Sequence, residues 1–347
     1  MNMPLQLRCW EGYEAPSLLE IFTQQTGVEV HAKTLLSDAD AAAQILRNST
    51  ECDVININNA YVQKVLHAAG LVRALDGQLE ELAESQLLDL FTRFKPWMYA
   101  SDSTTCIGIG QRFGPFNLVV NTRRISRHLA QDQGFTLAED PSARFGVLCY
   151  EDFNIFHIAI AAGLNPFIPM TEAQKMSFAT KARDWFSRAR VVSDSHFELN
   201  SALLKGDIDF YLSGGVYTVS PARRDGHDHL MAVTPRGGPI NGRGGIAFAE
   251  ITSIVSTTKQ IDEAHRLLSF VLEPKSAVQI AMSETTCNPV AQMGNPNVLS
   301  QFSADALGVI QWETLEEDLE GCADYDIVPD HDELLALLRS AASTRVG

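Results

Sequence analysis

Apolar positions in the first third of the chain alternate between strand-like and helix-like spacing. An apolar strand at residues 5–7 is followed by a helical face over 18–22, which Gly27 ends. A second strand at 28–30 precedes a helix that Asp38 is expected to cap. Repeated strand–helix–strand units predict a mostly parallel sheet covered by helices.

The same alternation continues along the rest of the chain and predicts a second α/β unit. The elements expected are strands at 54–57, 118–120, 147–148, 210–212 and 246–255, and helices at 62–69, 155–162, 172–188, 264–271 and 276–282. Gly206 ends a further helix just before the strand at 210–212. Five glycines between Gly237 and Gly245 predict a flexible connection, which is the best hinge candidate.

The length and the charge of the chain narrow the classes of protein. A chain of 347 residues exceeds the usual size of one hydrophobic core, so two lobes are expected. The net charge of -16 argues against nucleic acid as a partner and is compatible with a cationic solute. No apolar run reaches the roughly eighteen residues of a membrane span, and Met1–Trp10 does not resemble a signal peptide. Either an export signal has been removed or the protein stays inside the cell.

Motifs for metals, cofactors and catalysis are absent from the sequence. Six separated cysteines show no metal-ligand spacing, and most are expected to be buried thiols. Two histidines in the segment 225–229 could face a metal, but a solvated loop is the preferred interpretation. Gly108, Gly110 and Gly114 have the wrong spacing for a dinucleotide fingerprint and are expected to form a turn. No metal and no cofactor are predicted.

An aromatic and acidic cluster is the most informative feature. Trp10, Glu11 and Tyr13 follow the first predicted strand, at the sheet edge where open α/β folds bind ligands. Alternatively, Trp10 and Tyr13 only cover the core. The rest of the chain favours the ligand-binding interpretation.

Four segments of the chain resemble one known family. The segment CWEGYEAP at 9–16, followed by SLLEIFTQQTGVEV, resembles the start of the mature spermidine/putrescine-binding proteins. The pair DVI and YVQK at 53–64, the stretch from Gly244 to FVLEPKSAVQIA, and LLKGDIDFYLSGG at 203–215 are similar to later parts of that family.

The resemblance implies a two-lobed, type II periplasmic-binding-protein-like α/β fold. Each lobe would hold a mostly parallel sheet flanked by helices, and hinge strands near 115–121 and 244–252 would cross between the lobes. Lobe 1 would comprise 1–117 and 247–295, and lobe 2 would comprise 118–246 and 296–347.

The resemblance also implies a binding site for an amine. Carried over position by position, the family's amine-stacking aromatics fall on Trp10, Tyr13 and Phe248, and its carboxylates fall on Glu151 and Glu250. Aromatic faces and carboxylates together hold an ammonium or guanidinium group well. Trp10 and Glu151 are expected on opposite sides of one cleft.

Several positions depart from the family pattern. Asn154 replaces a carboxylate, Asn58 and Ala60 replace a serine and a tyrosine, Gly214–Gly215 replaces a tryptophan, and Thr286 lies near a missing tyrosine. Arg112 and Arg243 stand near the crossing segments and could engage a solute carboxylate, although surface or interlobe ion pairs are the preferred interpretation. The candidate ligand-binding set is Trp10, Glu11, Tyr13, Asn58, Arg112, Glu151, Asn154, Arg243, Phe248 and Glu250.

The sequence therefore predicts a monomeric solute-binding receptor of an ABC importer. It would be periplasmic, with a cytoplasmic location left open, and would work with a membrane permease. Its solute would be a small amine with an anionic group, such as an amino-acid derivative or opine-like compound. A polyamine is the second hypothesis. Two further hypotheses are an intracellular sensor with the same fold and an enzyme that uses Glu11, Glu151 or Glu250 as acid and base.

Overall fold

The computed structural model describes residues 3–343, which fold into two compact units. Unit 1 consists of Met1–Phe113 and Phe248–Ala306, and unit 2 of Gly114–Ala247 and Leu307–Gly347. The expected lobe bounds differ from these units at residues 114–117, 247 and 296–306. The chain ends at 1–2 and 344–347, which the expected lobes included, lie outside the described residues.

Two long strands contain two of the three boundaries between the units. Strand β4 (Ile109–Asn121) includes the boundary after Phe113, and β9 (Gly245–Ile254) includes the boundary after Ala247. Every residue of both strands is buried. These two strands therefore carry several polar side chains into the interior, where each must find a hydrogen-bond partner.

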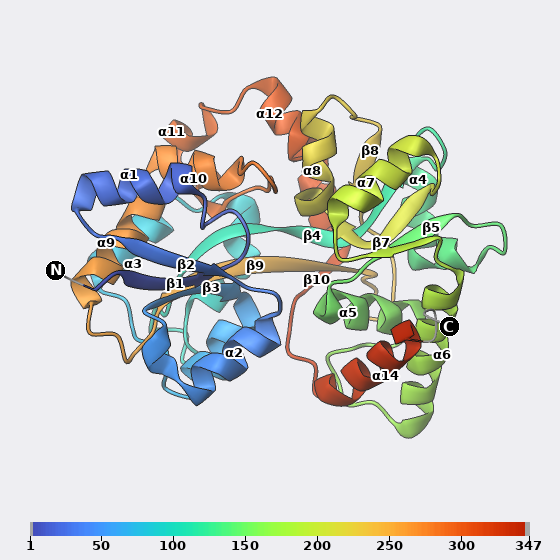
Figure 1. Cartoon of the computed structure of the whole chain (residues 1–347), viewed down its shortest axis with the longest axis horizontal. Helices are drawn as coiled ribbons and strands as arrows, with labels where there is room; N and C mark the ends of the chain where they lie inside the picture. The colour runs from blue at the N-terminus through green and yellow to red at the C-terminus, as the bar shows by residue number, and fades with distance from the viewer. Residues whose placement is uncertain (1–2, 344–347) are drawn as a thin grey trace. The chain divides into compact units, whose positions relative to one another are not determined.

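Unit 1 is built on three parallel strands. Strand β1 (Leu5–Cys9) pairs in parallel with β2 (Val30–Thr34) and β3 (Val54–Asn58), and β9 lies antiparallel beside β3. Figure 1 shows α1 and α10 on one side of this sheet and α2 on the other. The helices of unit 1 are α1 (Pro16–Thr26), α2 (Asp38–Arg47), the π-helix Tyr61–His67, α3 (Gly77–Glu84), α9 (Ile261–Val271), α10 (Pro274–Ala281) and α11 (Pro296–Leu299), with 3₁₀ segments at Ser49–Glu51, Asp89–Met98 and Ala291–Gly294.

Unit 2 has its own parallel core. Strand β5 (Phe145–Leu148) lies between β6 (Val191–Ser193) and β7 (Phe210–Gly215), and all three are parallel. Strand β4 runs antiparallel to β7 and to β8 (Leu230–Val233), and β10 (Cys322–Asp324) pairs with the first residues of β9. Helices α5 (Glu151–Ala161), α6 (Glu172–Arg188) and α14 (His331–Ser343) lie on one side of the sheet, and α7 (His196–Lys205) and α8 (Val216–Arg224) on the other (Figure 1).

Unit 2 contains these and further helices, and one helix includes the third boundary between the units. They are α4 (Arg127–Gln133), α5 (Glu151–Ala161), α6 (Glu172–Arg188), α7 (His196–Lys205), α8 (Val216–Arg224), α12 (Ala304–Val309), which includes the boundary after Ala306, α13 (Leu315–Glu320) and α14 (His331–Ser343), with 3₁₀ segments at Gly134–Glu139 and Trp312–Thr314. Within residues 3–343, each helix is too short or too polar to cross a bilayer.

Local chemistry explains where the predicted helices begin and end. Helix α1 starts with Pro16 in its first turn and ends at Gly27, whose φ of 71° suits a residue without a side chain. Gly206 ends α7 in the same way with a φ of 77°. A reciprocal capping box between Thr171 and Gln174 starts α6.

The structure contradicts one expectation about glycines and shows close backbone packing at a second group of glycines. Gly110 and Gly114 lie within strand β4 and not in a turn. A Cβ atom at Gly110 would lie 2.2 Å from the ring of Phe91, so glycine permits close packing there. In the expected flexible connection, a Cβ atom at Gly244 would lie 2.1 Å from the carbonyl oxygen of Gly237, and the hinge role of this segment stays a prediction. These glycines allow two backbone segments to approach each other.

Candidate functional site

The carboxyl ends of the parallel strands in unit 1 bring together residues from three segments. Trp10 directly follows β1, Asp38 begins the helix after β2, and Asn58 is the last residue of β3. Parallel strands end at the same edge of a sheet, and open α/β sheets bind ligands at that edge. The structure thus places Trp10 and Asn58 together, as a site on this edge requires.

Asp38 is the centre of this group. Its carboxylate is 1% exposed and accepts hydrogen bonds from the Trp10 indole N–H at 3.1 Å and from the Asn58 side-chain amide at 2.7 Å. The Asn58 backbone N–H donates to it as well, at 3.2 Å. The expectation that Asp38 caps α2 is wrong, because the Ser37 hydroxyl accepts from the Asp40 backbone and takes that role. The Asp38 side chain is therefore directed to the sheet edge.

Asn58 has an unused hydrogen-bonding atom. The residue is 3% exposed, and its Oδ1 accepts no hydrogen bond from any residue in the range 3–343. A buried acceptor without a donor is energetically costly. A solute N–H group would provide such a donor.

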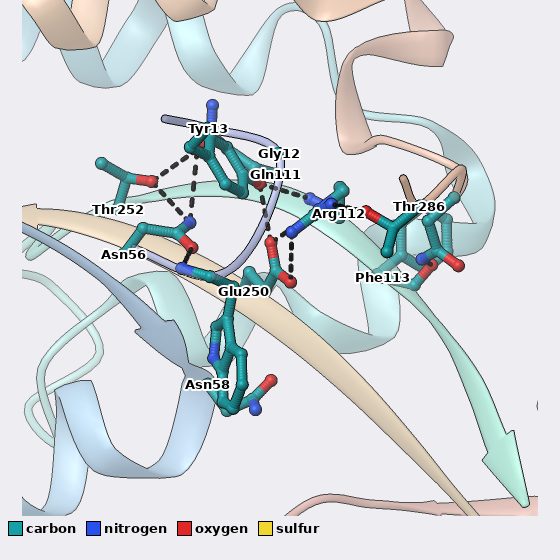
Figure 2. A network of polar contacts seen from close by, with 12 residues as sticks. Gly12, Tyr13, Asn56, Asn58, Gln111, Arg112, Phe113, Glu250, Thr252 and Thr286 are labelled. Atoms are coloured by element: carbon teal, nitrogen blue, oxygen red, sulfur yellow. Dashed lines mark hydrogen bonds and ion pairs between the residues drawn. The ribbon is translucent and has the colours of Figure 1, made fainter. Parts of the chain in front are cut away.

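A second cluster lies in unit 1 around Arg112 and Glu250 (Figure 2). The Arg112 guanidinium donates to the Glu250 carboxylate through Nε at 3.0 Å and Nη2 at 3.1 Å. Its Nη1 donates to the Thr286 hydroxyl at 3.0 Å, and its Cζ lies 4.6 Å from the centre of the Tyr13 ring. The Tyr13 hydroxyl donates to Glu250 at 2.7 Å. Both charged groups are fully engaged with each other.

Burial governs the protonation of this cluster. Arg112 is 0% exposed and Glu250 is 2% exposed. Burial raises the pKa of Glu250 above its ordinary value, whereas the Arg112 charge and the Arg112 and Tyr13 hydrogen bonds oppose that shift. Burial, followed by the charge of Glu250, holds the pKa of Tyr13 well above its usual range. The tyrosine therefore stays a neutral hydrogen-bond donor.

Gly12 allows the Trp10–Tyr13 turn to pack on Arg112. Its φ is +101°, and a Cβ atom there would lie 3.1 Å from Arg112 Nη1 and 2.7 Å from Ser283 Oγ. Only glycine fits both the backbone conformation and the space. The Trp10 backbone N–H also lies 3.5 Å from Asn56 Oδ1, and Asn56 donates to Thr252 at 2.9 Å. The turn between β1 and α1 is thus attached to the sheet.

The candidate residues of unit 2 have partners of their own. Glu151 begins α5 and accepts two hydrogen bonds from Arg339 of α14, at 2.6 and 2.7 Å. Both hydrogens of the Asn154 amide are used, by the Leu148 carbonyl at 2.9 Å and the Ser213 hydroxyl at 2.8 Å. The side-chain amide of Asn154 is therefore engaged within the protein, and a contact between Asn154 and a solute stays a prediction.

The remaining candidates differ in exposure. Arg243 is exposed in the loop before β9, Phe248 is 4% exposed, and Glu11 is half-buried with a charge that raises the pKa of Glu250. The position of the missing tryptophan is filled, since a Cβ atom at Gly214 would lie 2.2 Å from the Tyr211 ring. An aromatic side chain has no room there.

Sequence reasoning missed several residues that organise these groups. The sequence predicts Asp38 as a helix cap and places Thr286 only near a tyrosine that the family has. Its patterns do not indicate Arg339 or Ser213 as partners. A signal existed for Asp38 alone, because the neighbouring Ser37 is an equally suitable cap and leaves the Asp38 carboxylate available shortly after a parallel strand.

Metal ligation finds no support within residues 3–343. That range contains no group of three or more His, Cys, Asp and Glu side chains placed to hold an ion. The rings of His227 and His229 stand 5.9 Å apart in a perpendicular arrangement. No disulfide bond joins the six cysteines, which all lie within residues 3–343; five are buried, and Cys149 is partly accessible.

Known proteins similar to this chain share one type of fold. No family model matches the chain. The spermidine/putrescine-binding periplasmic protein 1 of Haemophilus influenzae is 24% identical over 330 residues, covering 90% of this chain and 84% of that protein.

Solved structures extend the similarity over nearly the whole chain. The substrate-binding protein PotD of a Streptococcus pneumoniae spermidine/putrescine ABC transporter has a TM-score of 0.69 and 14% identity, covering 98% of this chain and 100% of its own. The PBP MotA of A. tumefaciens B6, solved with glucopine, has a TM-score of 0.65 and 14% identity, covering 99% and 100%. The predicted type II periplasmic-binding-protein fold is confirmed, and so is the predicted resemblance to spermidine/putrescine-binding proteins.

Proposed function

We infer that this chain is the solute-binding receptor of an ABC importer, and we propose that its solute is a small amine with one cationic group. The receptor class follows from the likeness to the H. influenzae and S. pneumoniae binding proteins. The solute class is supported by the sheet edge of unit 1. There, one buried carboxylate, one indole and one amide oxygen without a donor lie together.

The observation that carries this proposal is the group formed by Asp38, Asn58 and Trp10. An ammonium group offers positive charge and N–H donors, and this group offers a carboxylate, an acceptor and an aromatic side chain. Asp38 already holds Trp10 and Asn58 in place, so the acceptors are fixed before a solute arrives. The site is suited to binding and contains no nucleophile–base pair.

A polyamine is the second candidate, because the H. influenzae relative is named for spermidine and putrescine. A compound with an added anionic group is favoured by the glucopine-bound structural neighbour and by the Arg112–Glu250 pair, which neutralises one of the two carboxylates expected to hold amines. That Trp10 and Glu151 contact the same solute stays a prediction. So do a periplasmic location, a permease partner and a monomeric state.

Titration calorimetry is expected to show binding of a zwitterionic amine and much weaker binding of spermidine. The second amine of spermidine would lack a carboxylate, which lowers its affinity by about a hundredfold. Mass spectrometry of the recovered solute should find it unchanged. Submicromolar spermidine binding without any response to zwitterions would favour the polyamine hypothesis, and chemical conversion of the solute would indicate an enzyme. The genomic neighbourhood separates an importer subunit from an intracellular sensor.

Replacing Asp38 with asparagine should lower the affinity for an amine solute by about tenfold to a hundredfold, because a charge-assisted contact is lost while the side chain keeps its size. Calorimetry on the same solute measures the change. Asp40→Asn is the matched control, since Asp40 lies exposed on the same helix and the substitution removes the same charge. Equal affinities in the two variants would contradict a binding role for Asp38.

A further inference from the structure

The cluster around Arg112 has the composition of a cation-binding site. It consists of an aromatic face from Tyr13, a carboxylate from Glu250 and a hydroxyl from Thr286. These three groups attract a positive charge through the ring quadrupole, through ion pairing and through a hydrogen bond. The site holds a cation that belongs to the protein itself.

Arg112 fills this site completely. Nε, Nη1 and Nη2 each donate a hydrogen bond, and the guanidinium stands 4.6 Å from the Tyr13 ring centre. The Arg112 side chain is 0% exposed. Its backbone N–H also lies 3.4 Å from the Tyr13 hydroxyl. The strand and its side chain are thus both attached to the same group of acceptors.

We propose that Arg112 is a specificity-determining residue that occupies a cation subsite from within the protein and so restricts the solute to a single cationic group. The proposed restriction on the solute rests on the proposed function, whereas the occupancy of the cation subsite by Arg112 does not. With Arg112 in place, Glu250 is neutralised and Tyr13 is covered. A second ammonium group then finds no free carboxylate in this cluster.

An ion pair that serves stability alone differs from this arrangement in a measurable way. Buried ion pairs add little stability over apolar residues of the same volume, so stability by itself is a weak reason for such a pair. A purely structural pair is damaged when the arginine is shortened. A cation subsite that restricts the solute, once it is emptied, accepts both a matching cation and the second cationic group of a longer solute.

The test shortens the arginine and supplies the missing fragment. Arg112→Ala removes two methylene groups and the guanidinium, and N-ethylguanidinium has the same composition as that fragment. Calorimetry should show saturable binding of N-ethylguanidinium to Arg112→Ala, with a Kd at least about tenfold lower than for Arg112→Ala/Glu250→Gln. The wild-type protein, whose subsite is filled, should not bind it. Sodium chloride at equal ionic strength controls for screening.

Equal Kd values in the single and double variants, or equal binding to the wild-type protein, would overturn the proposal. If Arg112→Ala is unfolded in buffer, refolding is followed by circular dichroism as N-ethylguanidinium is added at millimolar concentration. Ligand binding to the folded state promotes folding, so recovery supports the proposal, and an absence of recovery contradicts it.

A putrescine titration examines the consequence for the solute. Putrescine should bind Arg112→Ala about tenfold more tightly than the wild-type protein, since the opened subsite accepts its second ammonium group. Unchanged putrescine affinity together with N-ethylguanidinium binding would reject the specificity role and keep the internal occupancy. Failure of the wild-type protein to bind any amine would instead count against the proposed function, independently of the guanidinium result.

Discussion

Arg112→Met is expected to lower the free energy of unfolding by about 3–5 kcal/mol at neutral pH. The substitution keeps most of the side-chain volume but leaves Glu250, which is 2% exposed, without its opposite charge. Isolated charges in protein interiors are costly because little solvent remains to stabilise them. The Tyr13 hydroxyl would remain as a partner, at 2.7 Å, and cannot neutralise the carboxylate.

The loss should depend on pH in a defined direction. Burial and the charge of Glu11 raise the pKa of Glu250, whereas Arg112 lowers it. Removing Arg112 therefore raises the pKa of Glu250 further. The unfolded chain releases this proton near pH 4, whereas the folded variant keeps it to higher pH. The folded state then binds more protons in that window, and stability falls as the pH rises. The deficit is therefore smallest near pH 4 and largest at neutral pH.

Denaturant unfolding of the wild-type protein and the variant at pH 4 and pH 7 measures both effects. Arg236→Met is the control, because Arg236 forms an ion pair with Asp132 in which both side chains are nearly half exposed. That change should cost less than about 1 kcal/mol. A deficit for Arg112→Met that is as small as the control, or that is equal at both pH values, would show that Glu250 is not a buried charge dependent on Arg112.

The sheet edge of unit 1 could be predicted from sequence because it depends on local patterns. Apolar spacing located β1 and β3, and residues that directly follow parallel strands must share one edge. Trp10 is therefore expected at this edge, and the structure places it directly after β1, whereas Asn58, the last residue of β3, became a candidate only through the family resemblance. Asp38 was misread, because the same carboxylate can cap a helix or turn to the sheet, and only the neighbouring Ser37 decides between the two.

An ion pair was the preferred interpretation of Arg112, but its burial and its partner Glu250 could not be predicted, since the two residues are 138 positions apart. Arg112 lies in a part of β4 that contains glycine, proline and polar residues, which does not resemble a buried strand. Glu250 is predicted to bind a solute amine because the family resemblance identifies the position of this carboxylate. The resemblance does not show which protein residue carries the opposite charge. The pairing depends on the register between distant strands, and periodicity within one segment carries no information about that register.

His157 is expected to make the protein unstable in acid. It is 0% exposed, and its Nε2 lies 2.8 Å from the Phe116 carbonyl oxygen, which can only accept, so Nε2 carries the proton. Nδ1 then accepts from the Ser213 hydroxyl at 2.9 Å. The Asn154 amide donates to the Ser213 oxygen, so the hydroxyl proton of Ser213 remains available to His157. The neutral ring is thus fully hydrogen-bonded, and no acceptor faces a second proton.

Burial lowers the pKa of His157 to about 3, whereas an unfolded histidine has a pKa of about 6.5. Between these values the unfolded chain binds a proton that the folded state does not, so stability falls as the pH falls. The loss is about 1.4 kcal/mol per pH unit and reaches about 4–5 kcal/mol near pH 3. Above pH 6.5 this histidine makes no pH-dependent contribution.

Denaturant unfolding at intervals between pH 7 and pH 4 should reveal this slope, and His157→Gln should remove it. Glutamine keeps an N–H donor for the Phe116 carbonyl but cannot titrate. The variant is therefore expected to be somewhat less stable than the wild-type protein at pH 7, and to lose less stability than the wild-type protein as the pH falls. His128→Gln is the matched control, because the His128 side chain is 74% exposed, and its slope should equal that of the wild-type protein. If the wild-type and His157→Gln slopes were the same, protonation of other groups would account for acid unfolding, and the buried Asn154–Ser213–His157 chain would have no part in it.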